Sequence, residues 1–248
     1  MTLWHLEWYR LVRTRRLLAL VAVFGFFGLT APLLTVYMEQ LLGSAGEGVT
    51  IQFPDPTPDI AVGQFTSNAF QIGLLVAIVI AAGSLAFDAR PELAAFLRTR
   101  TTSTWQLVLP RFAISTAAIV VAFGLGLVAT WYQTVVLIDP PDATGMLTGA
   151  ALTCAYLAFA VVVTTFATSL VRSVLTAVAV AVALLLALPV IGIVGAVAPW
   201  LPSRLLGALP ELAAGAETGE YLRALGTTLA GIPPLLAAAV HRLDRREG

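Results

Sequence analysis

The stretch Ala177–Ile193 reads AVAVAVALLLALPVIGI and lies inside a run, 173–203, that contains no charged residue. About 20 apolar residues in a helix cross a hydrocarbon core roughly 30 Å thick, and this run exceeds that length. Its apolar residues are continuous, whereas the strands of a membrane barrel alternate apolar and polar side chains. A helix also satisfies its own backbone hydrogen bonds in lipid. The stretch therefore predicts a membrane-spanning helix.

Other parts of the chain repeat this pattern. Only 11% of the residues are charged and 58% are apolar, whereas soluble domains carry about 25% charged residues. Five more runs lack Asp, Glu, Lys and Arg: 17–38, 60–87, 112–138, 143–171 and 224–240. We therefore predict an all-α polytopic membrane protein, a single transmembrane domain over 1–248. Its six transmembrane helices are expected at about 17–38, 64–87, 105–138, 145–170, 174–198 and 221–240.

The placement of arginine predicts the orientation. The chain has no lysine, and twelve of its fourteen arginines flank the predicted spans on one side, leaving only Arg204 and Arg223 on the other. Positive residues are enriched on the cytoplasmic side of membrane proteins. Both termini are therefore expected in the cytoplasm, which requires an even number of spans. The residue usage, rich in Ala and Arg, indicates a GC-rich bacterial genome and hence a bacterial plasma membrane.

Residues 2–16 predict an N-terminal interfacial helix. Trp4, Trp8, Leu11 and Val12 form an apolar stripe at helical spacing, and arginines occupy other faces. Helices with aromatic and arginine residues commonly lie in the membrane interface. Glu7 and Arg15 interrupt the stripe, so a basic flank that only sets the topology is the alternative.

The cytoplasmic loop between spans two and three, 88–110, predicts a second short helix at about 90–99. Pro91 and Glu92 suit its first turn. Leu93, Phe96 and Leu97 then recur at helical spacing. A helix of two turns has little stability alone, so it needs either the membrane surface or a groove on a soluble partner.

The outer side carries two further features. The loop 39–59 is rich in Gly and Pro and predicts an extended segment. Residues 203–214, between spans five and six, predict a short outer helix with leucines on one side. Within span five, Pro189 predicts a kink, and Gly145 and Gly149 match the G-x-x-x-G packing motif.

This order of elements resembles a known family. The interfacial helix, six spans, the loop FDARPELAAFLRTRT at 87–101 and the pair Pro110-Arg111 are similar to the ABC-2 type permeases, the membrane subunits of ATP-driven exporters. The resemblance covers the whole chain in layout but only about 88–111 in residues, and the Thr-rich tract 99–104 departs from it. It implies that 90–99 is a coupling helix for a separate ATP-binding subunit. The implied contact residues are Glu92, Leu93, Phe96, Leu97, Arg98 and Arg100.

The resemblance also implies the partners and the function. Two permease chains, alike or different, would pair in the membrane and bind two copies of the ATP-binding subunit. The expected function is export of a hydrophobic or amphipathic substrate, with ATP and Mg bound by the partner and no cofactor bound by this chain. The alternative is a non-transporting membrane scaffold that recruits a cytoplasmic partner through 88–101. A neighbouring gene for an ATP-binding protein would favour the exporter.

Several chemistries lack their sequence signals. The chain has no G-x-x-x-x-G-K-[ST] phosphate loop, and no ionisable residue is expected deep in a span, where ion-coupled transporters usually need one. His5 and His241 lie near the two ends and Cys154 is the lone cysteine, so no metal site or catalytic constellation is expected. We therefore expect a transport subunit rather than an enzyme, and no nucleic acid partner.

A few polar residues within the spans are candidates for a substrate pathway. Gln64, Asn68 and Gln71, with Ser67, form a polar stripe on the outer half of span two. Thr30 and Tyr37, seven residues apart, share a face of span one. The alternative for the amides is hydrogen bonding between helices. For the threonines, including Thr153, Thr164 and Thr168 of span four, the alternative is a hydrogen bond from the hydroxyl to a backbone carbonyl one turn earlier.

Overall fold

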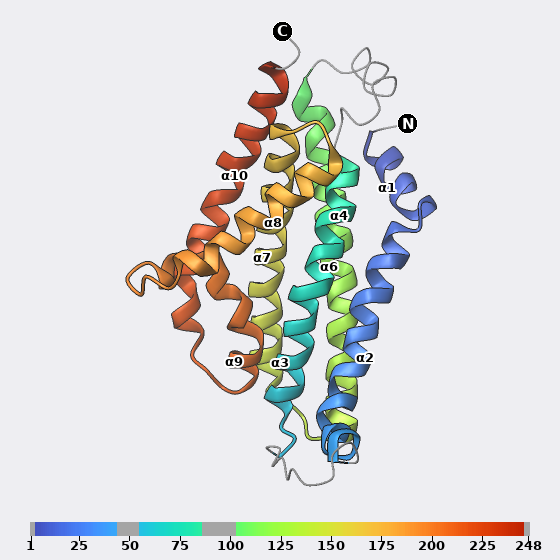
Figure 1. Ribbon diagram of the computed structural model, residues 1–248, viewed down its shortest axis with the longest axis vertical. Coiled ribbons are helices and arrows are strands. Elements are labelled where there is room, and N and C mark those ends of the chain that lie inside the picture. The colour runs from blue at the N-terminus through green and yellow to red at the C-terminus, as the bar shows by residue number, and fades with distance from the viewer. Residues whose placement is uncertain (1–2, 44–54, 86–102, 246–248) are drawn as a thin grey trace.

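The computed structural model describes residues 3–43, 55–85 and 103–245, and within these residues the regular structure is helical (Figure 1). The elements in chain order are α1 (Leu3–Arg13), α2 (Arg16–Gly43), α3 (Pro58–Asn68), the π-helix η1 (Ala69–Gly73), α4 (Leu74–Leu85), α6 (Thr104–Leu137), α7 (Ala143–Leu170), α8 (Val174–Ile191), the 3₁₀ turns η3 (Ala198–Trp200) and η4 (Pro202–Gly207), α9 (Ala208–Ala213), the 3₁₀ turn η5 (Thr218–Tyr221) and α10 (Leu222–Arg245). Six helices of the described chain are long and apolar enough to cross a membrane. The predicted all-α class and six spans agree with this.

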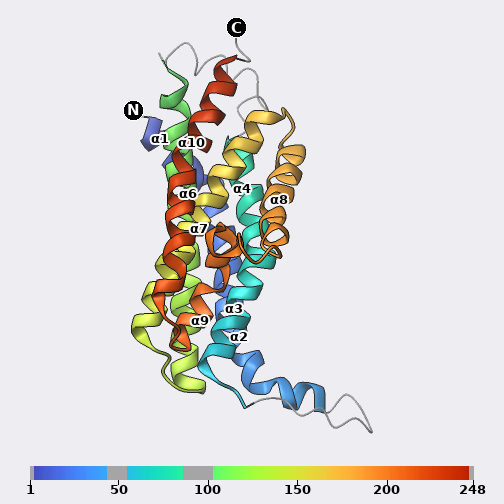
Figure 2. The ribbon, with the colours of Figure 1, turned by 90° about the vertical axis from the view of Figure 1, so that its left-hand side faces the viewer.

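The helices form an elongated bundle. Figures 1 and 2 show α1, the start of α6 and the end of α10 at one end, here called the terminal end. The helices α3, η1 and α4 follow one another without a break and act as one long helix, Pro58–Leu85. It ends at the terminal end, where residues 86–102 begin. The predicted coupling helix and its residues Glu92, Leu93, Phe96, Leu97, Arg98 and Arg100 lie outside the described residues.

The closest contact between long helices joins α2 to α6. A Cβ atom added to Gly28 would lie 2.2 Å from the carbonyl oxygen of Gly126, and one added to Gly126 would lie 2.5 Å from that of Phe24. Only glycine allows backbones to approach this closely. Beside this contact the ring of Phe123 packs against Phe24, with centroids 5.9 Å apart, and against Phe65, at 5.6 Å. These aromatic contacts join α2, α3 and α6.

Helix bounds differ from the prediction at four places. The first predicted span, α2, continues as a helix to Gly43 into the predicted extended loop, the second span begins at Pro58 rather than at 64, and the sixth, α10, ends at Arg245 rather than at 240. Proline at the first position of a helix is favourable, because its missing N–H needs no partner there. The fifth span, α8, ends at Ile191 instead of 198, so Pro189 lies in its last turn rather than at a central kink.

The predicted outer helix, 203–214, is two elements, the 3₁₀ turn η4 and the α-helix α9. A continuous α-helix would place Pro210 in its interior, where it removes a hydrogen bond; because α9 begins at Ala208, Pro210 falls in the first turn. This segment packs on the start of α7. A Cβ atom on Gly145 would lie 2.0 Å from the carbonyl oxygen of Leu212, and one on Gly149 would lie 2.7 Å from Cα of Leu209. The two glycines of the G-x-x-x-G motif therefore form the surface of α7 against which α9 packs.

Candidate functional site

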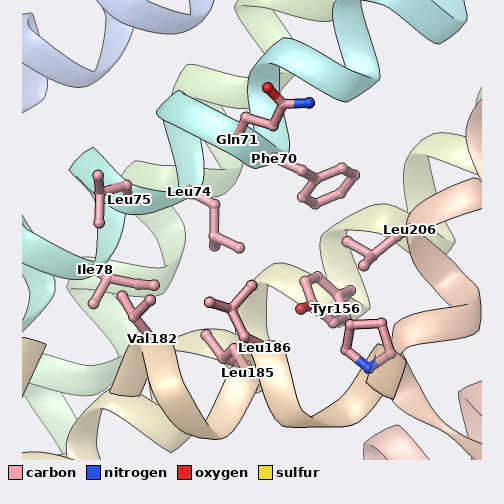
Figure 3. Close-up of a pocket in the computed structure, with 11 residues that line it drawn as sticks. Phe70, Gln71, Leu74, Leu75, Ile78, Tyr156, Val182, Leu185, Leu186 and Leu206 are labelled. Carbon is pink, nitrogen blue, oxygen red and sulfur yellow. The ribbon is translucent and has the colours of Figure 1, made fainter. Parts of the chain in front are cut away.

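An apolar cavity of about 430 Å³ lies between α4, α7 and α8 (Figure 3). One wall comes from η1 and α4, the opposite wall comes from α8, and Tyr156 of α7 and Leu206 of η4 complete it. Nearly all of its surface is hydrocarbon. The lining residues are Phe70, Gln71, Leu74, Leu75, Ile78, Tyr156, Val182, Leu185, Leu186, Pro189 and Leu206.

Two irregularities of the helices shape this cavity. The π-helix η1 contributes Phe70 and Gln71, and a π-helix carries more residues per turn than an α-helix, so it locally widens the helix and changes the direction of its side chains. The ring of Phe70 packs edge-on against Tyr156, with centroids 5.6 Å apart and an angle of 86°. Opposite, Pro189 lies on the wall just before α8 ends. Such bulges within helices occur frequently at functional sites.

Polar groups are confined to two positions of the cavity. Figure 3 shows the amide of Gln71 turned away from the centre of the cavity, and its Nε2 donates to Ser67 Oγ at 3.1 Å. The hydroxyl oxygen of Tyr156 lies among leucine side chains of α8 (Figure 3). A cavity with this lining suits a hydrocarbon ligand, because no charged group of the described residues faces it.

The predicted pathway residues fall in different places. Gln71 lines the cavity, and Gln64 and Asn68 are half-buried on the same long helix. The hydrogen bond from Gln71 to Ser67 joins two residues of the predicted polar stripe. Thr30 and Tyr37 lie on α2 and are not among the lining residues. The Oγ1 of Thr30 donates to the carbonyl oxygen of Phe26 at 2.8 Å, the local alternative expected for threonine.

The threonines of α7 follow that alternative in part. Thr164 donates to the carbonyl oxygen of Ala160 at 2.8 Å, and Thr168 donates to that of Thr165 at 2.7 Å. Thr153 is fully buried, and its hydroxyl forms no hydrogen bond among the described residues. Two of the three hydroxyls are thus satisfied within their own helix.

A buried ion pair lies at the terminal end. Nε of Arg111, on α6, donates to Oε1 of Glu7, on α1, at 2.7 Å, and the two side chains are only 4% and 7% exposed. Arg10 adds a weaker contact to Glu7 at 3.8 Å. This pair joins the N-terminal helix to the third span, because separating it would break a short contact between two buried charges.

Ser84 links this ion pair to the helix that carries the cavity. Its Oγ accepts a hydrogen bond from Nη1 of Arg16 at 2.6 Å, and its carbonyl oxygen accepts one from Nη1 of Arg111 at 3.4 Å. Ser84 stands two residues before the segment 86–102. Beyond that segment, the hydroxyl of Thr104 donates to Asp244 on α10. We call Glu7, Arg16, Ser84 and Arg111 the terminal cluster.

The sequence pattern does not predict the terminal cluster. Glu7 interrupts the apolar stripe of the first helix, yet it is buried, while Trp4 and Trp8 beside it are about half exposed. Arg111, expected at the entry of span three, is the eighth residue of α6 and is buried. Glu7 is an acid on an apolar helix face and Arg111 is a base within an apolar helix, and charged residues at such positions are usually paired. This pattern could have predicted the ion pair.

No group of three or more His, Cys, Asp or Glu residues that could hold a metal ion occurs in the described part of the chain. Comparison of the chain with protein-family models, curated proteins and solved structures finds no match.

Proposed function

We propose that this chain is the membrane-spanning permease subunit of an ATP-driven exporter. One observation carries the proposal: a single long helix, Pro58–Leu85, bears both a wall of the apolar cavity and the residues that precede the loop 86–102. Ile78 of the cavity and Ser84 of the terminal cluster are six residues apart, or about 9 Å along a helix. Movement of the loop would therefore reach the cavity through a rigid element.

The terminal cluster would spread that movement across the bundle. Ser84 is bonded to Arg16 of α2 and to Arg111 of α6, and Arg111 holds Glu7 of α1. A partner that pushes on 86–102 would therefore shift three neighbouring helices together rather than bend one. Hydrogen bonds to charged groups are stronger than neutral ones, which suits this role.

The substrate in this proposal is hydrophobic or amphipathic. The cavity holds about 430 Å³ and lies between helices that are apolar enough to cross a membrane. An acyl chain would replace lipid contacts with equivalent contacts to leucine and phenylalanine. ATP hydrolysis belongs to a separate cytoplasmic subunit, two copies of which would bind a pair of permease chains.

The test is co-purification. The tagged chain is co-expressed with the ATP-binding protein encoded beside its gene, and ATPase activity is measured in nanodiscs. We expect a stable complex that is lost in the double variant Glu92→Ala/Phe96→Ala. The matched control, Asp139→Ala/Leu147→Ala, removes the same kinds of side chain at exposed positions of the other end and should keep the complex. A chain that purifies without an ATPase would overturn the proposal in favour of a scaffold.

A further inference from the structure

A second pocket, of about 610 Å³, lies where η3, η4, η5 and the first turn of α10 meet. It is distinct from the apolar cavity in character, because four charged residues line it: Arg204, Glu217, Glu220 and Arg223. The turn η4 separates the two, with Leu206 on the apolar cavity and Arg204 on the charged pocket. We call this second pocket the charged pocket.

Exposed apolar side chains lie in the segment that leads into the charged pocket. The helix α8 ends at Ile191, and residues 192–197 connect it to η3. In this connection Ile193 and Val194 are 82% and 61% exposed, and Trp200 of η3 is 51% exposed. An apolar edge with a tryptophan is typical of the membrane interface.

The charges of the pocket are unequally compensated. Arg204 is already bound to two carboxylates, Glu211 at 3.2 Å and Glu220 at 3.3 Å. Arg223 instead stacks over Trp200, with its guanidinium carbon 5.5 Å from the ring centroid. Within the described residues neither Arg223 nor Glu217 forms an ion pair. One cation and one anion therefore remain available on the same pocket.

We propose that the charged pocket binds the head group of a zwitterionic phospholipid from the surrounding bilayer. The phosphate would accept hydrogen bonds from Arg223, the ammonium would donate to Glu217, and the acyl chains would lie along Ile193 and Val194. Guanidinium groups bind phosphate well because their donors form a planar fork. The four lining charges sum to zero, so a net anionic head group would leave Glu217 unpaired. Phosphatidylethanolamine fits this charge pattern.

The experiment measures retained lipid. The purified full chain is exposed to an equimolar mixture of phosphatidylethanolamine and phosphatidylglycerol and analysed by native mass spectrometry. We expect preferential retention of phosphatidylethanolamine, reduced roughly tenfold in Arg223→Gln and in Glu217→Gln, the factor that loss of one charged hydrogen bond produces. Arg172→Gln is the matched control, because Arg172 is also exposed but lies at the other end of α8.

Three results would overturn the proposal. Equal retention of the two lipids would refute the charge pattern, and an unchanged preference in Arg223→Gln and Glu217→Gln would refute the pocket. Displacement of the lipid by millimolar soluble phosphoethanolamine would show that the site binds the free head group rather than a membrane lipid. Glu217→Gln keeps the test decisive if Arg223→Gln misfolds, because Glu217 makes no ion pair in the described fold. No outcome depends on an ATP-binding partner.

Discussion

Arg111 and Glu7 meet at 2.7 Å across 104 residues of sequence, and both side chains are almost fully buried. The contact ties the first helix of the chain to the third span. Replacing Glu7 by Ala should therefore destabilise the protein by about 3–5 kcal/mol, because a buried guanidinium loses the carboxylate that lies 2.7 Å from it. Thermal unfolding in detergent measures this loss.

The control for this pair is the double variant Glu7→Leu/Arg111→Met. Replacing both charges with apolar groups removes the buried cation together with its carboxylate, so most of the stability should return. Arg10→Gln breaks only the longer contact of a more exposed side chain and should cost below about 1 kcal/mol. If Glu7→Ala is as stable as the parent protein, the ion pair does not hold α1 in place.

The π-helix predicts an unusual tolerance to deletion. Removing Ile72 from η1 should convert the bulge into a regular α-helix and leave both flanking segments on their original faces. The variant should fold but lose affinity for a pyrene-labelled fatty acid, because Phe70 and Gln71 would leave the cavity wall. Fluorescence titration in nanodiscs measures the affinity.

Deletion of Val79 is the matched comparison. Val79 is 47% exposed and Ile72 is 50% exposed, but Val79 lies in the regular helix α4. Its removal would rotate one part of that helix by about 100° relative to the other. We expect this variant to aggregate on extraction. Equal behaviour of the two deletions would contradict the role assigned to η1.

Filling the apolar cavity should block ligand binding without unfolding the chain. Leu186 lines the cavity and is 63% exposed, so the larger ring in Leu186→Trp has room to enter it. We expect affinity for the labelled fatty acid to fall roughly tenfold, equivalent to about 1.4 kcal/mol. Val190→Trp adds the same ring at a position that is 64% exposed and absent from the lining. It should bind as the parent does; a matching loss would place the ligand elsewhere.

The glycine contact between α7 and α9 predicts a strong effect of one methyl group. In Gly145→Ala the new Cβ would overlap the carbonyl oxygen of Leu212, which is backbone and cannot rotate away. We expect a loss of about 1–3 kcal/mol, seen as a lower Tm in detergent. In Gly226→Ala nothing lies within 4 Å of the new atom. That variant should be neutral or more stable, because alanine favours helix.

The bundle could be predicted from sequence because its signal is continuous. Long uncharged runs predict the spans, and the distribution of arginine predicts which helix ends lie on the same side of the bundle. The bounds that failed depend on local geometry: Pro189 falls in the last turn of α8, and Pro210 divides the outer segment. Neither outcome follows from hydropathy, because an average of residue polarity does not depend on where proline lies within a helical turn.

The candidate sites were harder to predict. Gln71 could be chosen because an amide is conspicuous in an apolar span, but the cavity around it is built from leucines that look like lipid-facing residues. The π-helix has no signal in a single sequence. Glu7 and Arg111 pair only in three dimensions, and each looked like an exception to its own segment.

The glycine contact of α2 with α6 has a consequence for biosynthesis. Gly126 follows Gly28 by 98 residues, so the ribosome makes the partner roughly 5–20 s after the first span. During that interval the surface of α2 at Gly28 has no α6 to pack against. The first span must wait beside the insertion machinery or in lipid until the third arrives, and a chaperone or translocon subunit that shields this groove would speed assembly.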